Sequence, residues 1–360
     1  MKPIKILGAG LAGLTAAINL AKAGYEVAVF EQHDDVGKRF DGDLQGIENW
    51  SEQLDTRADF ARMNLEINFD FDPSYELVVK NRVATERLHF ERALFYLVKR
   101  GSGAGSLDQG LKRQALEAGV ELHFGQTIPT SEADIIATGP NPRETFVIGK
   151  GVIFKSCPQT SAVTDAAIAL IEPGRALTGY SYLLMVGGYG TICSVLFDDF
   201  PAIHRCYEQS RQVFDVMLPL GKLQMKKVGG VGCIALRNEW QQGPSLVVGE
   251  AAGLQDFLWA YGIRHALNSG YLAAHCIIHH QDYAVLARQN FESKLKASLV
   301  NRYLWEKLMV SHFSPYLGKL IKRADVFKLL RSLHSYNYGQ RLLYPFALRK
   351  MRKRYPALRL

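Results

Sequence analysis

A short apolar segment, residues 4–7, runs directly into the glycine-rich turn Gly8-Ala9-Gly10-Leu11-Ala12-Gly13. An alanine-rich helical pattern follows, and a second apolar segment, residues 27–30, ends at Glu31. This is the order of elements in a βαβ unit that binds a dinucleotide: strand, turn, helix, strand and terminal acid. Because all these parts agree, a bare βαβ unit without a nucleotide is disfavoured, and we expect an α/β fold with a Rossmann-like sheet.

Each glycine of the turn has its own expected role. Gly8 permits the tight turn, Gly10 leaves room for a pyrophosphate, and Gly13 lets the helix pack close to the sheet. The start of the helix offers free N–H groups and a partial positive charge to phosphates. Glu31, which is followed by Gln32, is placed to accept hydrogen bonds from ribose hydroxyls. An acidic side chain at this position would repel the 2′-phosphate of NADP, so we predict that the dinucleotide is FAD or NAD.

Two further motifs follow at a distance. A predicted strand, residues 134–137, leads into Thr138 and Gly139. Another, residues 246–248, leads into Gly249-Glu250-Ala251-Ala252-Gly253, and after a loop a helix of small residues opens at Gly262 and Ile263.

Together the three motifs resemble the flavoproteins with a glutathione-reductase-type FAD fold, in the branch of para-hydroxybenzoate hydroxylase. Within that branch the chain is most similar to the geranylgeranyl-reductase-like oxidoreductases, and the resemblance covers nearly all of the first 280 residues. It implies non-covalent FAD, with Gly249 and Glu250 at the ribityl chain and the helix from Gly262 pointing at the flavin ring. Glu250 replaces the usual Asp of the family, which keeps the carboxylate but extends its reach.

The segment of residues 35–50 passes close to the adenosine and the flavin in the resembling family. Lys38, Arg39 and Arg100 are expected to contact phosphate or ribose, and the alternative for each is an exposed loop charge. A polar set in the same segment lines the active site or else caps a loop, and we favour the site: Asp41, Asp43, Glu48 and Asn49, beside Phe40 and Trp50.

The FAD-binding domain is expected to be discontinuous, with residues 1–50, 100–140 and 246–290. Residues 51–99 and 141–245 should form an inserted substrate domain, an antiparallel β-sheet over the flavin, and residues 291–360 a basic helical region. Two β-rich segments flanking residues 187–190 predict a hairpin. Its first strand holds the nearest match to the aromatic signature of geranylgeranyl reductases, which makes Tyr180 and Tyr182 the candidates for catalysis.

Composition narrows the class of protein further. The chain has 360 residues, 48% of them hydrophobic, which suits a globular protein of about two domains. No uninterrupted apolar stretch reaches the ~18 residues of a membrane span, and the first apolar run is read as a strand rather than a signal peptide. Five cysteines lack paired or metal-ligand spacing, so we expect a cytoplasmic protein without a metal. The oligomeric state stays open.

The last sixty residues are strongly basic. They hold fourteen Lys and Arg and two acids, a net charge of +12 within a chain of net charge +8. From residue 291 onward apolar residues recur at helical spacing, first from Phe291 to Met309 and then from Leu317 to Leu330. These stripes predict either a helical cap on the core or an amphipathic surface that touches an anionic membrane or a lipid. Binding to nucleic acid is not expected, because no recognised module accompanies the charge.

The expected activity follows from the flavin. Residues 228–232 are rich in glycine but lack a following helix, so we expect a strand there and no second nucleotide loop. NAD(P)H or another reductant would then dock transiently. We expect reduction of a carbon–carbon double bond in an apolar, isoprenoid or lipid-like small molecule. The alternatives are an FAD-dependent monooxygenase that uses NAD(P)H and oxygen, and a flavin-binding protein without catalysis.

Overall fold

The glycine-rich turn joins the first two strands of a parallel sheet, β1 (Ile4–Leu7) and β2 (Val27–Glu31), through helix α1 (Leu11–Lys22). The computed structural model describes residues 2–82, 84–155, 164–172, 175, 178–218, 224–236, 239–309, 325–356 and 358. The strand order of this sheet is β15-β16-β9-β1-β2-β8. Its other strands are β8 (Glu121–Phe124), β9 (Ile135–Ile136), β15 (Gln241–Gln242) and β16 (Ser245–Val247). All pairs are parallel except β15 with β16.

Helices bury the apolar strands of this sheet. Serine favours the start of a helix, and the hydroxyl of Ser106 caps α3 (Leu107–Glu117) by accepting from the Gln109 N–H at 3.2 Å. Helix α6 (Ile263–Ile278) packs directly on α1. Gly270 makes this approach possible, because a Cβ there would overlap the backbone carbonyl of Ala12.

The second sheet has the order β14-β10-β13-β12-β11-β5-β6 and is antiparallel except between β11 and β5. Its strands are β5 (Glu76–Lys80), β6 (Thr85–His89), β10 (Thr145–Lys155), β11 (Ala166–Leu170), β12 (Tyr180–Val186), β13 (Tyr189–Leu196) and β14 (Gln224–Cys233). The predicted hairpin is confirmed as β12 and β13, but its turn is only Gly187-Gly188. The glycine-rich residues 228–232 lie within β14, as expected of a strand.

Two helices lie in segments that the sequence predicted as β-rich. Helix α5 (Ile203–Met217) packs on the second sheet through buried Tyr207 and Phe214, and helix α2 (Thr56–Arg62) lies in the first insertion. The apolar residues of α5 recur at helical spacing, and that signal was available in the sequence. A third, small sheet of β3 (Asp41–Glu48), β7 (Phe95–Gly101) and β4 (Asp72–Ser74) contacts the second through β13.

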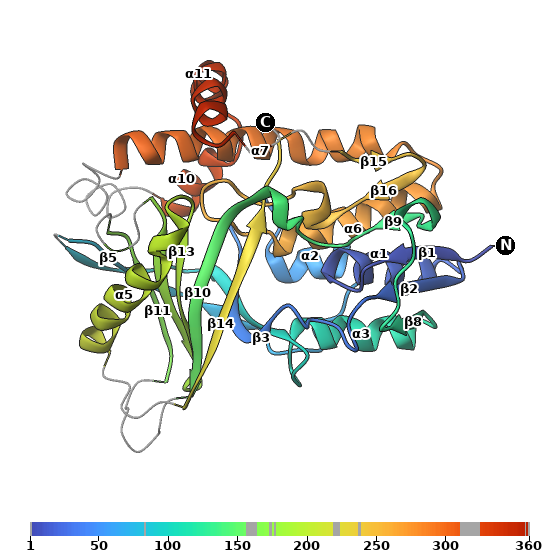
Figure 1. Cartoon of the computed structure of the whole chain (residues 1–360), viewed down its shortest axis with the longest axis horizontal. Helices are drawn as coiled ribbons and strands as arrows, with labels where there is room; N and C mark the ends of the chain where they lie inside the picture. Colours follow the sequence, from blue (N-terminus) through green and yellow to red (C-terminus); the bar gives the residue numbers. More distant parts are fainter. Residues whose placement is uncertain are drawn as a thin grey trace.

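The C-terminal region is helical, as predicted. It contains α7 (Tyr283–Leu304), a π-helical turn (Trp305–Met309), α10 (Val326–Leu333) and α11 (Tyr338–Arg354). Residues Phe291, Leu295 and Leu299 of the first stripe are buried, so α7 covers the core, and α11 rises from α7 at the top of the molecule (Figure 1). Part of the second stripe, residues 317–321, lies outside the described residues. In the described part of the chain, no helix is long and apolar enough to cross a membrane.

We expect Gly270→Ala to lower the free energy of unfolding by about 1–3 kcal/mol, because the added methyl group forces α6 away from α1. The better helix propensity of alanine offsets less than ~1 kcal/mol of this cost. Urea unfolding followed by circular dichroism measures the change. Gly103→Ala is the matched control, since no atom of the described residues lies within 4 Å of a Cβ at that position. Equal midpoints for the two variants would contradict the close packing of α1 on α6.

Candidate functional site

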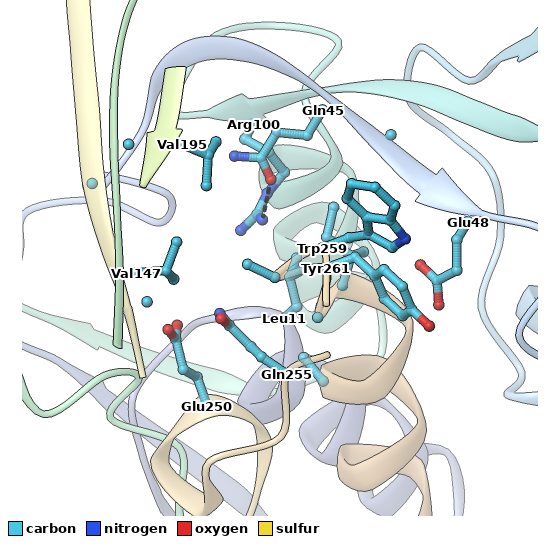
Figure 2. Close-up of a pocket in the computed structure, with 18 of the residues that line it drawn as sticks. Leu11, Gln45, Glu48, Arg100, Val147, Val195, Glu250, Gln255, Trp259 and Tyr261 are labelled. Atoms are coloured by element: carbon cyan, nitrogen blue, oxygen red, sulfur yellow. Dashed lines mark hydrogen bonds between the residues drawn. The ribbon is translucent and has the colours of Figure 1, made fainter. Parts of the chain in front are cut away.

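A single large cavity of about 1320 Å³ lies where the parallel sheet, the small sheet and the second sheet meet (Figure 2). The sequence-predicted site residues line it, with the exception of Gly13. They are Gly8, Ala9, Gly10, Leu11, Ala12, Glu31, Gln32, Lys38, Arg39, Arg100, Thr138, Gly139, Tyr180, Tyr182, Gly249, Glu250, Gly262 and Ile263. The fold thus gathers segments that lie far apart in the sequence around one space.

The three fingerprint glycines have the surroundings that their roles require. Gly8 has a φ of +105°, and a Cβ there would overlap the carbonyl of Ala137 at the end of β9. A Cβ on Gly13 would overlap the carbonyl of Gly8, so Gly13 brings α1 close to the turn without lining the cavity. At Gly10 a Cβ would meet no atom of the described residues within 4 Å. The turn therefore leaves open space at the start of α1, where an anion is favoured.

Glu31 ends β2 with its carboxylate turned back toward the glycine turn. Its Oε2 accepts from the Ala9 N–H at 2.9 Å, and its Oε1 accepts from the His33 N–H at 3.1 Å. Each carboxylate oxygen keeps further capacity to accept hydrogen bonds. Its role toward a ribose stays a prediction, and the structure places it at the cavity wall.

Arg39 and Glu250, which the sequence treated separately, form an ion pair across the cavity wall with an N–O distance of 2.5 Å. The other oxygen of Glu250 accepts from the Cys233 N–H at 3.0 Å, and Arg39 also donates to the carbonyl of Val231. The Glu250 carboxylate is therefore held between two strand ends before any ligand binds. Lys38 instead pairs with Asp34 at 2.9 Å near the surface.

Arg100 is a buried cation with its own counterion. Its guanidinium donates to both oxygens of Asp108, at 2.8 and 3.0 Å, and lies 4.2 Å from the centre of the Phe40 ring. Such a two-pronged pair fixes the plane of the guanidinium. The face of Arg100 toward the cavity is thereby held rigid at the end of β7.

Two loops that follow parallel strands complete the nucleotide side. Thr138 and Gly139 follow β9, and Gly139 has a φ of +76°. After β16, Gly249 opens a 3-10 turn with a φ of +64°, and a Cβ there would lie 2.9 Å from the Cβ of Ala12. Gly262 is the N-cap of α6, so the positive end of that helix dipole also faces the cavity.

Tyr180 and Tyr182 lie two residues apart on β12, so their side chains share one face of the sheet, and both line the cavity. The Tyr180 hydroxyl donates to the carbonyl of Trp259 at 2.5 Å. Burial raises the pKa of both phenols above the usual range, and burial raises the pKa of the neighbouring Cys193 thiol to about 12. At neutral pH these groups are uncharged, and a catalytic role for the two tyrosines stays a prediction.

The polar set beside Phe40 and Trp50 divides in the structure. Asp43, Glu48 and Trp50 line the cavity, whereas Asn49 caps the turn before α2 by accepting from the Thr56 N–H at 2.8 Å. A role in an active site stays a prediction for the lining members of the set. The lining residues that the sequence did not single out include Gln255, Tyr261 and His334. Tyr261 directly precedes the motif glycine Gly262, which was a usable signal.

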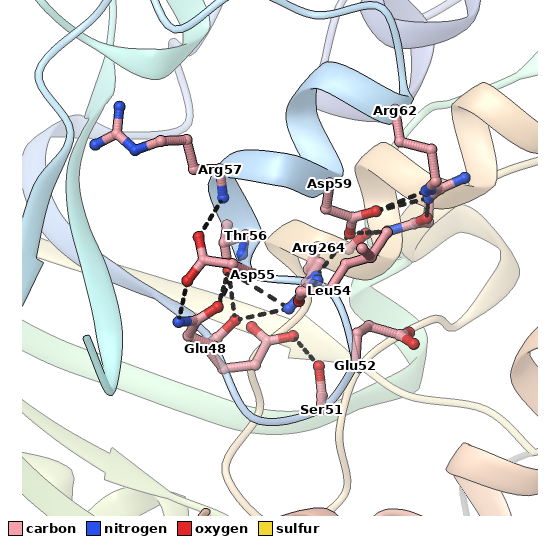
Figure 3. A network of polar contacts seen from close by, with 12 residues as sticks. Glu48, Ser51, Glu52, Leu54, Asp55, Thr56, Arg57, Asp59, Arg62 and Arg264 are labelled. Carbon is pink, nitrogen blue, oxygen red and sulfur yellow. Dashed lines mark hydrogen bonds and ion pairs between the residues drawn. The ribbon is translucent and has the colours of Figure 1, made fainter. Parts of the chain in front are cut away.

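Behind Glu48 lies a buried polar network centred on Arg264 (Figure 3). The Arg264 guanidinium donates to Asp59 Oδ2 at 2.7 Å and to the carbonyl of Leu54 at 2.7 Å. Burial alone would raise the pKa of Asp59, but the guanidiniums of Arg264 and Arg62 outweigh it and hold that pKa below its usual value. For Glu48 the balance is reversed. Burial raises its pKa to about 7 against the weaker lowering effects of Arg264, Ser51 and His334.

The other half of the cavity is lined mainly by hydrocarbon. The side chains come from the small sheet, the second sheet and helix α10, and include Leu77, Val79, Leu88, Phe90, Leu94, Ile168, Leu184, Val326, Leu329 and Leu330. Helix α10 therefore turns its apolar face to the cavity. Among the described residues, no group of three or more His, Cys, Asp or Glu side chains could hold a metal ion.

Fold and cavity define a protein with a Rossmann-type parallel sheet and a second, mostly antiparallel sheet. The family model for an NAD(P)-binding Rossmann-like domain matches residues 6–58. In the region of sequence similarity, the chain is 26% identical over 132 residues to thiamine thiazole synthase of Thermotoga maritima. That match covers 35% of this chain and 48% of the synthase, so it spans about half the length of this curated relative.

Solved structures are similar over nearly the whole chain. A geranylgeranyl bacteriochlorophyll reductase-like protein from Thermoplasma acidophilum has a TM-score of 0.68 and 15% identity, covering 98% of both chains. A flavin-dependent brominase has a TM-score of 0.62 and 14% identity, covering 98% of this chain and 99% of its own. Aklavinone-11 hydroxylase, solved with FAD and aklavinone, has a TM-score of 0.57 and 18% identity, covering 87% of this chain and 70% of its own.

These similarities confirm the predicted fold class, and they confirm the resemblance to geranylgeranyl-reductase-like flavoproteins at the level of the fold. They leave the substrate and the type of reaction unassigned, because reductase-like, halogenating and hydroxylating proteins share the fold.

We expect Glu48→Gln to stabilise the protein progressively as the pH rises from 5 to 8. The folded state keeps a proton on Glu48 between its usual pKa of 4.5 and about 7, so this group lowers stability as the pH rises through that window. Glutamine mimics the neutral acid and removes a cost of about 3 kcal/mol at pH 8. Thermal unfolding of both proteins across this pH range measures the difference. A melting-temperature difference that does not change with pH would contradict the raised pKa.

Proposed function

We propose that this protein is an FAD-dependent oxidoreductase that reduces a carbon–carbon double bond in an apolar, isoprenoid or lipid-like substrate. The observation that carries the proposal is the continuity of the cavity, which runs from the open space at Gly10 to the hydrocarbon lining beside α10. One continuous space thus offers an anion site and an apolar site together. The similarity in fold to a reductase-like protein and to flavin-dependent enzymes supports it.

The residues of the nucleotide half fit FAD. The turn at Gly10 and the start of α1 would hold the pyrophosphate, and Glu31 would accept from the ribose. Glu250, fixed by Arg39, would accept from the ribityl chain, and the start of α6 at Gly262 would face the flavin ring. When bound, FAD supplies hydride transfer, with NAD(P)H or another reductant as the transient donor.

The apolar half would bind the substrate. Tyr180 and Tyr182 of β12 and Leu329 and Leu330 of α10 line it. None of these side chains is charged at neutral pH. Such a lining suits a hydrocarbon substrate, because moving apolar surface out of water is favourable.

An anionic membrane surface is the partner we propose for α11. Tyr338, Leu342 and Phe346 recur every four residues along its outer face and are 76%, 58% and 66% exposed. Lys350 and Lys353 are exposed toward the end of the same helix. Apolar side chains beside basic ones suit the boundary of an anionic bilayer, where an apolar substrate also resides.

We expect the purified protein to be yellow with non-covalent FAD, and Gly10→Val to abolish FAD retention without loss of stability. The valine side chain would fill the pyrophosphate space, while in the ligand-free protein that space is open around Gly10. Absorbance spectra and thermal unfolding measure the two effects. Gly103→Val, in an open loop away from the cavity, is the control and should retain FAD. Full flavin occupancy in Gly10→Val would remove the proposed pyrophosphate site.

Oxygen consumption separates the proposed reductase from the alternative monooxygenase. With geranylgeraniol as the probe, we expect dithionite-reduced protein to add two hydrogen atoms to the probe without air, as mass spectrometry would show. A monooxygenase would instead yield a product with one added oxygen atom and consume oxygen in equal amount. That second result would establish the alternative and overturn the reductase assignment.

We expect binding to phosphatidylserine vesicles at low salt that is lost at high salt, and little binding to phosphatidylcholine vesicles. Each basic residue near the surface adds about 1 kcal/mol, screened beyond ~8 Å at physiological salt. Lys350→Glu with Lys353→Glu, or Leu342→Ser with Phe346→Ser, should weaken binding at least about tenfold. Val216→Ser, 85% exposed on α5, is the matched control. Failure of the wild-type protein to co-sediment at low salt would refute the membrane proposal.

A further inference from the structure

Glu48, the last residue of β3, carries its carboxyl group in the wall of the cavity (Figure 2). The residue is 2% exposed, and its Oε1 accepts from the Ser51 hydroxyl at 2.9 Å. Its Oε2 is buried and has no hydrogen-bond partner among the residues that the structure describes. A purely structural carboxyl group would be expected to satisfy both oxygens, because an unpaired buried acceptor costs about 1–3 kcal/mol.

Two more buried polar atoms of residues that line the cavity have no hydrogen bond within the described part of the chain. They are Trp50 Nε1 and His334 Nε2, the latter lying 3.7 Å from Asp256 Oδ2. The ring of Tyr261 links them, with its centre 6.1 Å from the Trp50 ring and 5.9 Å from the His334 ring. These polar atoms thus form a recess in a wall that is otherwise lined mostly by hydrocarbon. An apolar substrate would meet Glu48 at this recess.

The charged and titratable groups around Glu48 do not pair with its carboxyl group. Arg264 of α6 lies close but directs its guanidinium to Asp59, to Leu54 and to the backbone carbonyl of Glu48. His334, at the end of α10, lies 3.7 Å from Asp256, which outweighs the effect of burial and raises the pKa of His334 above its usual value. Tyr261 is neutral, since burial and Asp256 raise its pKa well above the usual value.

The protonation state of Glu48 follows from these surroundings. Burial dominates and raises its pKa to about 7, so the acid and the carboxylate are both populated near neutral pH. A general acid works best when its pKa lies close to the operating pH. By contrast, the phenols of Tyr180 and Tyr182 hold their protons too tightly to release them at neutral pH.

We infer that Glu48 is the proton donor of the double-bond reduction, an inference that rests on the proposed function. The reduction adds one hydride and one proton across the double bond. FAD, when bound and reduced by NAD(P)H, would be the source of the hydride and its two electrons, which go to one carbon. The carboxylic acid of Glu48 gives its proton to the other carbon and becomes a carboxylate, which takes up a proton from water after the product leaves.

The test compares Glu48→Gln and Glu48→Asp with the wild-type holoenzyme. Glu52→Gln is the matched control, because Glu52 is ion-paired with Lys294 and lies outside the cavity lining. Reduction of the flavin by dithionite should be unchanged in all four proteins. Reoxidation of the reduced flavin by geranylgeraniol, without air, should slow at least about a hundredfold in Glu48→Gln. Glu48→Asp should recover part of the rate, and the wild-type rate should fall as the pH rises through about 7.

Infrared spectroscopy of the FAD-loaded protein provides a readout that needs no turnover. At pH 6 the wild type should show the carbonyl band of a buried carboxylic acid, which disappears at pH 9 and is missing from Glu48→Gln. A wild type that leaves geranylgeraniol unreduced contradicts the proposed function and this inference with it. A Glu48→Gln protein that reduces the probe as fast as wild type, or a Glu48 that is ionised at pH 6, contradicts the inference alone.

Discussion

The buried guanidinium of Arg264 ties together the elements that surround the cavity. It is 1% exposed and joins α6 to Asp59 of α2 and to the carbonyl groups of Leu54 and Glu48 (Figure 3). A buried cation is tolerated only when its charge is paired and its N–H groups are hydrogen-bonded, and removing one partner of such a pair typically costs about 3–5 kcal/mol. The start of α6, the loop before α2 and the end of β3 are therefore fixed relative to one another. The geometry at Glu48 depends on this single side chain.

The parts of the fold that the sequence predicted are those encoded by local rules. The β1-α1-β2 unit needs only three glycines, an apolar pattern and a terminal acid within thirty residues, and Ser106 marks the start of α3 by its ability to cap. Helix α5 was missed because β-branched and aromatic residues in its segment outweighed a helical spacing that was present. Contacts such as Arg39 with Glu250, 211 residues apart, arise from the tertiary fold and leave no local trace.

His334 shows the same limit for the candidate site. In the sequence it is one histidine after an amphipathic stripe, and it reaches the cavity because α10 lines the apolar half of that cavity. Polar groups at the nucleotide side are, in contrast, already paired within the protein: Arg100 with Asp108 and Arg39 with Glu250. The glycine-turn side of the cavity is therefore preorganised and charge-balanced, whereas Glu48 Oε2, at the other end, has no hydrogen bond within the described residues.

The different states of Asp59 and Glu48 follow from how one guanidinium is directed. Both carboxyl groups are buried close to Arg264, but Asp59 receives direct hydrogen bonds from Arg264 and Arg62 and stays ionised. Glu48 offers Arg264 only its backbone carbonyl, so burial governs its side chain and favours the neutral acid. Two neighbouring carboxyl groups in different environments have different pKa values. Enzymes use this difference to keep one group ionised, as a structural or electrostatic carboxylate, while the other serves as a proton donor. In this protein the ionised Asp59 lies behind the cavity wall, and the neutral acid of Glu48 lies at the cavity.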